Sequence, residues 1–442
     1  MAVSPFDSAL YRGLFHDEEV GKLFTDSAEV RAMLLVEGAL AKVQGQLGVI
    51  PEVSGAFIHR AAMEFQLDPA GMAAETGKNA VPVPALVAAF RKAMEAPEHA
   101  QYVHWGATSQ DIVDTALVLR LRQAITILEG RLRGVIRALG AQAETNADLP
   151  MAARTLAQVA TPTSFGAVVA GWGWPLIRHL DRLAALKLRL LRVSLFGAAG
   201  TLSAMGPQGP EVRKGLAEAL GLGNAGDPWH AARDGVAELS GWLTGVAGSL
   251  AKTGEDLVLM AQSEVGEVRL GVGGASSTLP HKQNPVDPLL LTSLARHLAG
   301  LDANIQGAAA HRQQRDAAAW MVEWLALPEI VMGAGRALTV AEALVPRIAP
   351  LPDAMARNID GGLGLAYAEA LSFALADRMP RPEAKAAVEA LCREAMDAGR
   401  PLADLAARDW PGTDWAAHFT PAAQMGEAPA HARRFATAAI GV

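Results

Sequence analysis

The feature that most constrains this 442-residue sequence is an apolar stripe that follows Asp114. Apolar residues recur there at alternating steps of four and three over about three heptads, while most of the neighbouring arginines fall off the stripe. The stripe consists of Leu121, Ile125, Leu128, Leu132, Val135 and Leu139. This spacing predicts one long helix whose apolar face packs against other helices.

Two further long apolar patterns run from about Asp234 to Glu267 and from about Pro285 to Ala349. Aromatic residues make up only 5% of the chain, and β-branched runs with period-two alternation are scarce, so strands are not favoured. Long helices without internal stops are typical of an elongated bundle that partner subunits commonly complete. We therefore expect an all-α fold.

Charge and cysteine content limit the compartment and the partners. The chain has 39 Lys and Arg against 46 Asp and Glu, a net charge of −7, which disfavours nucleic-acid binding because phosphate neutralisation needs concentrated cations. The single cysteine, Cys392, cannot form an intrachain disulfide, which fits a reducing compartment. No signal peptide is evident near the N-terminus. We expect a soluble cytoplasmic protein with neither nucleic acid nor membrane as a partner.

One uncharged segment, Thr155 to Ile177, is long enough to cross a bilayer. It contains Pro162, Pro175, several hydroxyl side chains and three glycines, which a lipid-facing helix tolerates poorly. We therefore expect a helix that is buried on all sides inside a large bundle.

Familiar cofactor and metal motifs are not supported. The string GLGNAG (221–226) matches GxGxxG but follows a helical pattern rather than a strand, so we interpret it as a chance match. The histidines lack metal-site spacing, and no paired cysteines occur. We expect no cofactor and no metal.

The string HWGATSQDIVDTA (104–116) gathers hydroxyl and amide side chains at the start of the longest predicted helix. Two interpretations stay open. Ser109 or Asp111 caps the helix in the ordinary way, or the cluster supplies donors for a ligand carboxylate at a helix N-terminus.

Two more polar strings interrupt apolar sequence. ARTLAQVATPTSFG (153–166) carries Arg154, Thr155, Gln158 and Thr161, whose partners are either other bundle residues or a ligand. GVGGASSTLPHKQNPVDP (271–288) joins glycines and two serines to a lysine and an asparagine. Glycines let a loop close over a ligand and leave backbone N–H groups free to bind anions, so this composition favours a ligand-binding loop.

These three strings, in this order, resemble the fumarase/aspartase superfamily, whose flexible loop reads GSSxMPxKxN. Here the loop is ASSTLPHKQN (275–284), which departs only at Ala275 and Leu279. Within the superfamily the chain is most similar to the bacterial cycloisomerases of 3-carboxy-cis,cis-muconate. The segments closest to them are HWGATSQDIVDTA, FGAAGTLSAMG (196–206) and RQQRDAAAWMVEWLALPE (312–329).

The resemblance implies an architecture and a set of site residues. It implies a helical N-terminal domain (1–108), a central long-helix domain (109–350) and a helical C-terminal domain (351–442). It further implies a homotetramer with a twenty-helix core and active sites shared between subunits. The implied catalytic residues are Ser276 as general base, Lys282 and His104. The implied substrate-binding residues are Thr108, Ser109, Gln110, Arg154, Thr155, Gln158, Ser277, Asn284 and Arg315, with Asp111 in the same motif as Thr108.

One departure from the superfamily bears on the reaction. Adenylosuccinate lyases carry a histidine in the THxQxAxP string as general acid toward the leaving amine, and this chain has Leu156 there. A departing amine needs a proton donor. A cycloisomerase run in reverse expels a carboxylate whose conjugate acid has a pKa of about 4, which needs none. Leu156 therefore disfavours adenylosuccinate or argininosuccinate cleavage.

The expected function is that of a cofactor-independent cycloisomerase acting on a tricarboxylate, 3-carboxy-cis,cis-muconate, in protocatechuate breakdown. The alternative is a lyase of the same fold that releases fumarate from a substituted succinate, for example with nitrite as leaving group. A binding protein without catalysis is a third possibility, which the intact Ser276, Lys282 and Asn284 disfavour.

Overall fold

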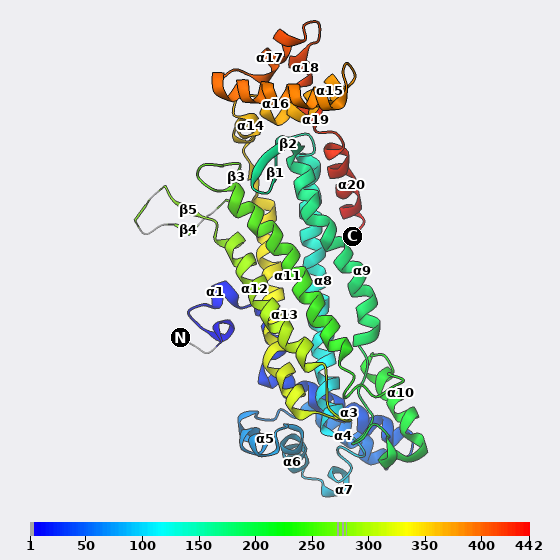
Figure 1. The fold of residues 1–442 in the computed structure, drawn as a ribbon. Helices are drawn as coiled ribbons and strands as arrows, with labels where there is room; N and C mark the ends of the chain where they lie inside the picture. The colour runs from blue at the N-terminus through cyan, green and yellow to red at the C-terminus, as the bar shows by residue number, and fades with distance from the viewer. Residues whose placement is uncertain (1–3, 272–273, 276–277, 280) are drawn as a thin grey trace. The chain divides into compact units, whose positions relative to one another are not determined.

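The computed structural model describes residues 4–271, 274–275, 278–279 and 281–442 (Figure 1). Helices make up almost all of its regular structure, which confirms the expected all-α class. By internal contacts the chain forms two compact units. Unit 1 comprises Met1–Gly130, His179–Ala247 and Leu294–Ala337, and unit 2 comprises Arg131–Arg178, Gly248–Ser293 and Leu338–Val442. The three-domain division at residues 108 and 350 stays a prediction.

Five long helices of the described chain contribute residues to both units. They are α8 (Ser109–Thr145), α9 (Phe165–Leu190), α11 (Asp234–Met260), α12 (Val286–Ala308) and α13 (Ala317–Leu344). The α8 helix contains the predicted apolar stripe. All six residues of the stripe are at most 2% exposed. The stripe is therefore a packing seam, as its spacing predicts.

The single helix expected from about Pro285 to Ala349 is wrong, because the chain forms α12 and α13 with a break between them. In the break, Gln313 has a positive φ of 56°. Asp316 then starts α13 by accepting hydrogen bonds from the backbone N–H groups of Ala318 (3.1 Å) and Ala319 (3.3 Å). The break contains neither proline nor glycine, so the sequence carries no strong helix-stop signal there. Similarly, α11 ends at Met260, before the predicted Glu267.

The buried helix expected over Thr155–Ile177 is wrong in its first part. Strands β1 (Pro150–Thr155) and β2 (Gln158–Ser164) form an antiparallel hairpin, with Thr155 opposite Gln158. The α9 helix begins only at Phe165. The two turn residues, Leu156 and Ala157, have positive φ values of 50° and 64°, as primed hairpin turns require, and Leu156 is 98% exposed.

The other helices of unit 1 are α1 (Arg12–Phe15), α2 (Glu18–Gly21), α3 (Asp26–Gln46), α4 (Glu52–Glu64), α5 (Ala73–Asn79), α6 (Val83–Met94), α7 (Pro97–Ala100) and α10 (Gly209–Leu220). One hydrophobic core of this unit is built mainly from α3, α4, α6, α8 and α10. The α3 and α4 backbones approach closely, because a Cβ at Gly55 would lie 2.5 Å from the Ala41 carbonyl oxygen. This contact fixes α3, which carries a buried carboxylate next to the site described below.

Unit 2 contains the remaining short elements. Its strands are β3 (Val268–Arg269), β4 (Gly274–Ala275), β5 (Gln283–Asn284) and β6 (Ala349–Pro350), in which β3 pairs with β6 and β4 with β5. Its helices are α14 (Pro352–Asp360), α15 (Ala368–Ala376), α16 (Arg381–Ala398), α17 (Leu402–Asp409), α18 (Trp415–His418), α19 (Pro421–Gln424) and α20 (Ala428–Ile440). Trp415 and the apolar faces of α15, α16 and α17 form a separate small core. The β1–β2 hairpin packs on α14 (Figure 1).

One stretch, Ala317–Arg347, is long and apolar enough to cross a membrane, and half of its most apolar window is buried within the protein. A core helix has the same length and composition. The α13 helix in this stretch supplies Trp320 and Glu323 to the interior of unit 1.

Candidate functional site

The first group of predicted site residues lies in unit 1, where α8 begins. Asp111 is fully buried and accepts a hydrogen bond from the Thr108 backbone N–H at 3.0 Å. The same carboxylate accepts from the backbone N–H groups of Phe196 (2.9 Å) and Gly197 (3.0 Å), and its Oδ1 lies 2.8 Å from Nε2 of His230. Asp111 therefore does more than cap the helix, because it joins the helix start to two distant segments of the chain.

Arg315 completes this group. Its Nη1 donates to the Thr108 hydroxyl at 2.7 Å, and its Nε donates to Oε1 of Gln110 at 3.3 Å. Gln110 is buried and donates in turn to the His230 carbonyl oxygen at 2.9 Å. The structure thus brings Thr108, Gln110 and Arg315 together, with Ser109 half-buried beside them. A guanidinium, hydroxyls and a helix N-terminus in one place can hold a carboxylate.

His104 lies just before this turn and contacts Glu37 of α3. Its Nδ1 is 2.7 Å from Oε1 of Glu37, whose side chain is only 1% exposed. Burial alone would lower the pKa of His104, but the charge and hydrogen bond of Glu37 and the charge of Asp111 raise this pKa above its ordinary value. His104 is therefore a cation over a wider pH range than a free histidine, which suits it to bind an anion.

The sequence motifs predict no role for Glu37. They likewise predict none for the buried charged residues that surround Arg233. Arg233 donates to the buried Asp114 and, through Nε at 2.8 Å, to the buried Glu323 of α13. Burial raises the pKa of the Asp114 carboxyl above its ordinary value, although Arg233 opposes this. The signal that could have revealed these groups is the presence of single carboxylates within apolar helical patterns, since an isolated buried charge needs a partner.

The second group of predicted residues lies in unit 2 on the β1–β2 hairpin. Arg154 binds the fully buried Glu267 with two hydrogen bonds, at 2.9 Å and 2.6 Å. Glu267 also accepts from Nδ2 of Asn358 at 3.0 Å. Thr155 and Gln158 face each other across the exposed tip. The guanidinium of Arg154 is thus held by its own chain, and its contact with substrate stays a prediction.

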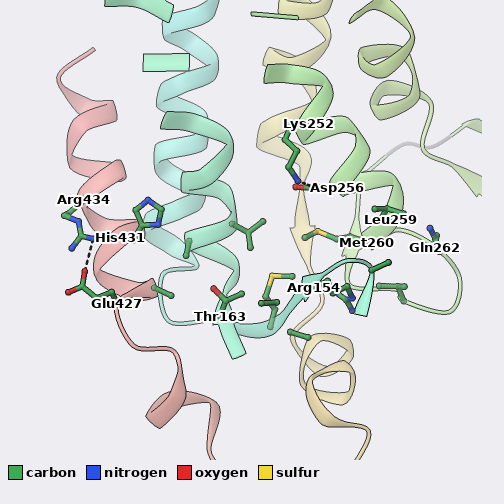
Figure 2. Close-up of a pocket in the computed structure, with 18 residues that line it drawn as sticks. Arg154, Thr163, Lys252, Asp256, Leu259, Met260, Gln262, Glu427, His431 and Arg434 are labelled. Carbon is green, nitrogen blue, oxygen red and sulfur yellow. Dashed lines mark hydrogen bonds and ion pairs between the residues drawn. The ribbon is translucent and has the colours of Figure 1, made fainter. Parts of the chain in front are cut away.

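A cavity of about 870 Å³ adjoins this hairpin (Figure 2). Figure 2 shows Arg154 and Thr163 on the hairpin side of the cavity, and other charged residues from α11 and α20 around it. Lys252 pairs with Asp256, and Arg434 pairs with Glu427. Because these charges are paired within the chain, the described lining does not offer the cluster of free cations that a polycarboxylate requires.

The third group belongs to the predicted loop. The described flanks form a small hairpin, in which Gly274 lies opposite Asn284 and Ala275 opposite Gln283. Lys282 is exposed and its backbone N–H donates to the Leu279 carbonyl at 3.0 Å, while Asn284 is half-buried. The predicted catalytic Ser276 and its neighbour Ser277 lie outside the described residues.

The structure therefore brings together part of the first predicted group. Thr108, Gln110 and Arg315 contact one another in unit 1, Ser109 lies on the same helix start, and His104 contacts Glu37. The hairpin residues Arg154, Thr155 and Gln158 and the loop residues Lys282 and Asn284 belong to unit 2. The roles of all these residues toward a substrate stay predictions.

Comparisons with known proteins agree along almost the whole chain. A sequence model of the lyase family matches residues 11–300. A 3-carboxy-cis,cis-muconate cycloisomerase of Pseudomonas aeruginosa is 40% identical over 401 residues, which cover 89% of this chain and 87% of that protein. A nitrosuccinate lyase of Streptomyces davaonensis is 35% identical over 413 residues, covering 90% of this chain and 87% of that protein. The crystal structure of a 3-carboxy-cis,cis-muconate lactonizing enzyme from Pseudomonas putida superposes with a TM-score of 0.91 and 33% identity, covering 98% and 99% of the two chains.

Proposed function

The chain belongs to the lyase family, and we propose that it is a cofactor-independent cycloisomerase that interconverts 3-carboxy-cis,cis-muconate and 4-carboxymuconolactone. The observation that carries this proposal is the 40% identity to a cycloisomerase of that substrate over 89% of the chain. We extend the proposal to a place in protocatechuate breakdown in the cytoplasm.

The proposed reaction is an internal addition. In the lactonising direction, a carboxylate oxygen of the substrate forms a bond to a carbon of the conjugated diene, and one double bond is lost. The electron pair moves to the carbon beside another carboxyl group, giving an enediolate-like intermediate. That carbon then takes a proton from Ser276, whose alkoxide is reprotonated from solvent. No atom enters or leaves except this proton, so the step needs no redox partner.

Stabilising the negative charge of this intermediate is the main catalytic task. Arg315, the N-terminus of α8 and the cationic His104 supply positive charge on one side of the proposed site. Lys282 and the loop backbone are proposed to complete it. Because the protein carries a net charge of −7 and the substrate is a trianion, positive potential must be concentrated at the site.

The residue at the hairpin tip supports this chemistry. A lyase that expels an amine needs an acid at the leaving group. The position that would hold it is Leu156, an exposed apolar residue that cannot donate a proton. Expulsion of a carboxylate, the reverse of lactonisation, has no such requirement.

A second candidate is a lyase that releases fumarate and nitrite from nitrosuccinate. The 35% identity to a nitrosuccinate lyase over 90% of the chain favours this alternative, and Leu156 suits it equally because nitrite leaves as an anion. The two candidates differ in the number of carboxylates that the site must bind.

A substrate panel separates the two candidates. Purified full-length protein, treated with a chelator, is mixed in parallel with 3-carboxy-cis,cis-muconate and with nitrosuccinate. We expect rapid loss of the diene absorbance with the first and little fumarate from the second. Rapid fumarate release without loss of diene absorbance would replace the cycloisomerase proposal by the lyase.

We also propose that the chain works as a homotetramer with active sites shared between subunits. Support comes from large apolar side chains that the single chain leaves exposed on its long helices, among them Leu188 of α9, Leu259 of α11 and Leu325 of α13. Sedimentation equilibrium tests this proposal, which predicts about four times the chain mass of 46.2 kDa. A fully active monomer would contradict it.

A further inference from the structure

We infer that Glu37 is a positioning residue for this reaction, which holds the His104 ring in place and in the charge state that binds a substrate carboxylate. The inference rests on the proposed function, because it takes His104 to face the substrate. Glu37 lies in the middle of α3, in unit 1, and no role for it follows from the motifs of the sequence.

The contact between the two side chains fixes the orientation of the imidazole. Nδ1 of His104 lies 2.7 Å from Oε1 of Glu37. Glu37 is buried, whereas the His104 side chain is 21% exposed, so the ring reaches from the interior toward solvent. Because Nδ1 faces the carboxylate, the ring presents Nε2 to a ligand. A carboxylate behind a histidine commonly fixes its proton in this way.

The backbone around His104 is held in a strained conformation. His104 has a positive φ of 63°, which is unfavourable for a residue with a side chain. Arg91 donates to the Val103 carbonyl at 2.9 Å, and Gln44 donates to the Trp105 carbonyl at 2.7 Å. Strain of this kind persists only where surrounding contacts enforce it, and it concentrates at functional sites.

Glu37 and Gln44 act from the same face of α3. They lie about two helical turns apart, and both side chains are buried. One binds the His104 ring and the other the next peptide carbonyl. The α3 helix, itself fixed by its close contact with α4, therefore serves as the rigid support of the 103–105 turn.

The charges around His104 favour the imidazolium. Glu37 from α3 and Asp111 from α8 raise the pKa of His104, while burial and Arg91 from α6 lower it, and the raising effects prevail. Without the negative charge of Glu37, only Asp111 would raise the pKa of His104 against the lowering effects of burial and Arg91. The ring would then lose its proton at a lower pH.

Stability alone does not account for Glu37. A carboxylate in an apolar helix interior is costly to bury, and among the described residues Oε2 of Glu37 is buried without a hydrogen-bond partner. An apolar residue of similar size would avoid this cost. The buried carboxylate therefore points to a function in which its charge is used.

The test measures binding of propane-1,2,3-tricarboxylate, a saturated tricarboxylate probe, to full-length protein by calorimetry between pH 5.5 and 8.5. The variant Glu37→Gln keeps the shape and an acceptor oxygen but removes the charge. We expect its affinity to fall about 10-fold at pH 7.5, the effect of losing one charged hydrogen bond. At pH 5.5 the two affinities should lie closer together, because more of the His104 imidazole is protonated in the variant at low pH than at pH 7.5.

Two controls make the result specific. Glu64→Gln is the same change on the exposed end of α4 and should leave affinity unchanged at every pH. In a His104→Gln background, Glu37→Gln should no longer change the affinity at any pH, because the ring on which it acts is absent. If Glu37→Gln does not fold, Glu37→Asp takes its place, because the shorter side chain withdraws the carboxylate from Nδ1 of His104.

Equal loss of affinity at all pH values, or no loss, would overturn the inference, as would absence of probe binding to the wild type. The experiment measures probe binding and not turnover, so its result can be distinguished from failure of the proposed function. A wild type that binds the probe with this pH pattern but leaves 3-carboxy-cis,cis-muconate unchanged would refute only the cycloisomerase.

Discussion

Arg233 and Asp114 form a bidentate ion pair in the interior of unit 1. Nη1 of Arg233 lies 2.7 Å from Oδ2 of Asp114, and Nη2 lies 3.1 Å from Oδ1. Both side chains are at most 1% exposed. The same guanidinium binds Glu323, so Arg233 contacts two buried carboxylates near the start of α8, and His311 lies 3.7 Å from Glu323 as well.

Replacement of Arg233 by methionine should therefore be severely destabilising. Two buried carboxylates would lose their cation, which costs about 3–5 kcal/mol in the free energy of unfolding. Urea titrations at fixed protein concentration measure this loss. Arg12→Met, at an exposed ion pair with Glu18, is the matched control and should unfold like the wild type.

The loss in the free energy of unfolding that Arg233→Met causes should become smaller as the pH falls. In the wild type, burial already holds the pKa of Asp114 above its unfolded value, and removal of Arg233 raises it further. A carboxyl with a raised folded pKa stabilises the fold at low pH and loses this contribution as the pH rises through that pKa. A deficit that is constant from pH 4.5 to 8 would contradict the account.

Asp111→Asn should weaken substrate use more than it weakens the fold. The carboxylate accepts hydrogen bonds from three backbone N–H groups and contacts His230, and an amide offers a single acceptor oxygen for them. We expect kcat/KM to fall about 10- to 100-fold, mainly through KM, because the Thr108 turn loses its support. Steady-state kinetics and a melting curve on the same sample decide this. Unchanged KM would show that the turn does not depend on Asp111.

Two substitutions at the tip of the β1–β2 hairpin should stabilise the protein. Leu156 and Ala157 both adopt positive φ, which asparagine and glycine tolerate far better. The double variant Leu156→Asn, Ala157→Gly should gain about 1–2 kcal/mol in the free energy of unfolding. Ala160→Gly, on β2, is the control and should destabilise. A destabilised double variant would contradict this prediction.

The sequence was sufficient for the long helices whose apolar residues follow a regular period. The stripe from Leu121 to Leu139 is buried as predicted, because its period and length leave no competing structure. Residues 155–164 were predicted as helix and form a hairpin, because Leu156 and Ala157 are not turn-forming residues and the apolar composition suits either structure.

The motif residues of the candidate site could be predicted from the sequence, but the residues that hold them in place could not. Thr108, Gln110 and Arg315, which the resemblance implies as substrate-binding residues, lie in contact, and their role toward a substrate stays a prediction. The contacts of Asp111 with His230, and of Glu37 with His104, join segments far apart in the chain. No local pattern specifies such pairs, and only the unexpected polarity of single buried positions indicates that they exist.

The most direct test of the account is the rate at which Ser276→Ala removes the diene absorbance of 3-carboxy-cis,cis-muconate, relative to the wild type and in the presence of chelator. A proton-transfer group contributes about 100-fold or more to a rate. We therefore predict fast loss of absorbance with the wild type and a rate at least about 100-fold lower with a correctly folded variant. A variant within about threefold of the wild type would contradict the role of the loop serine.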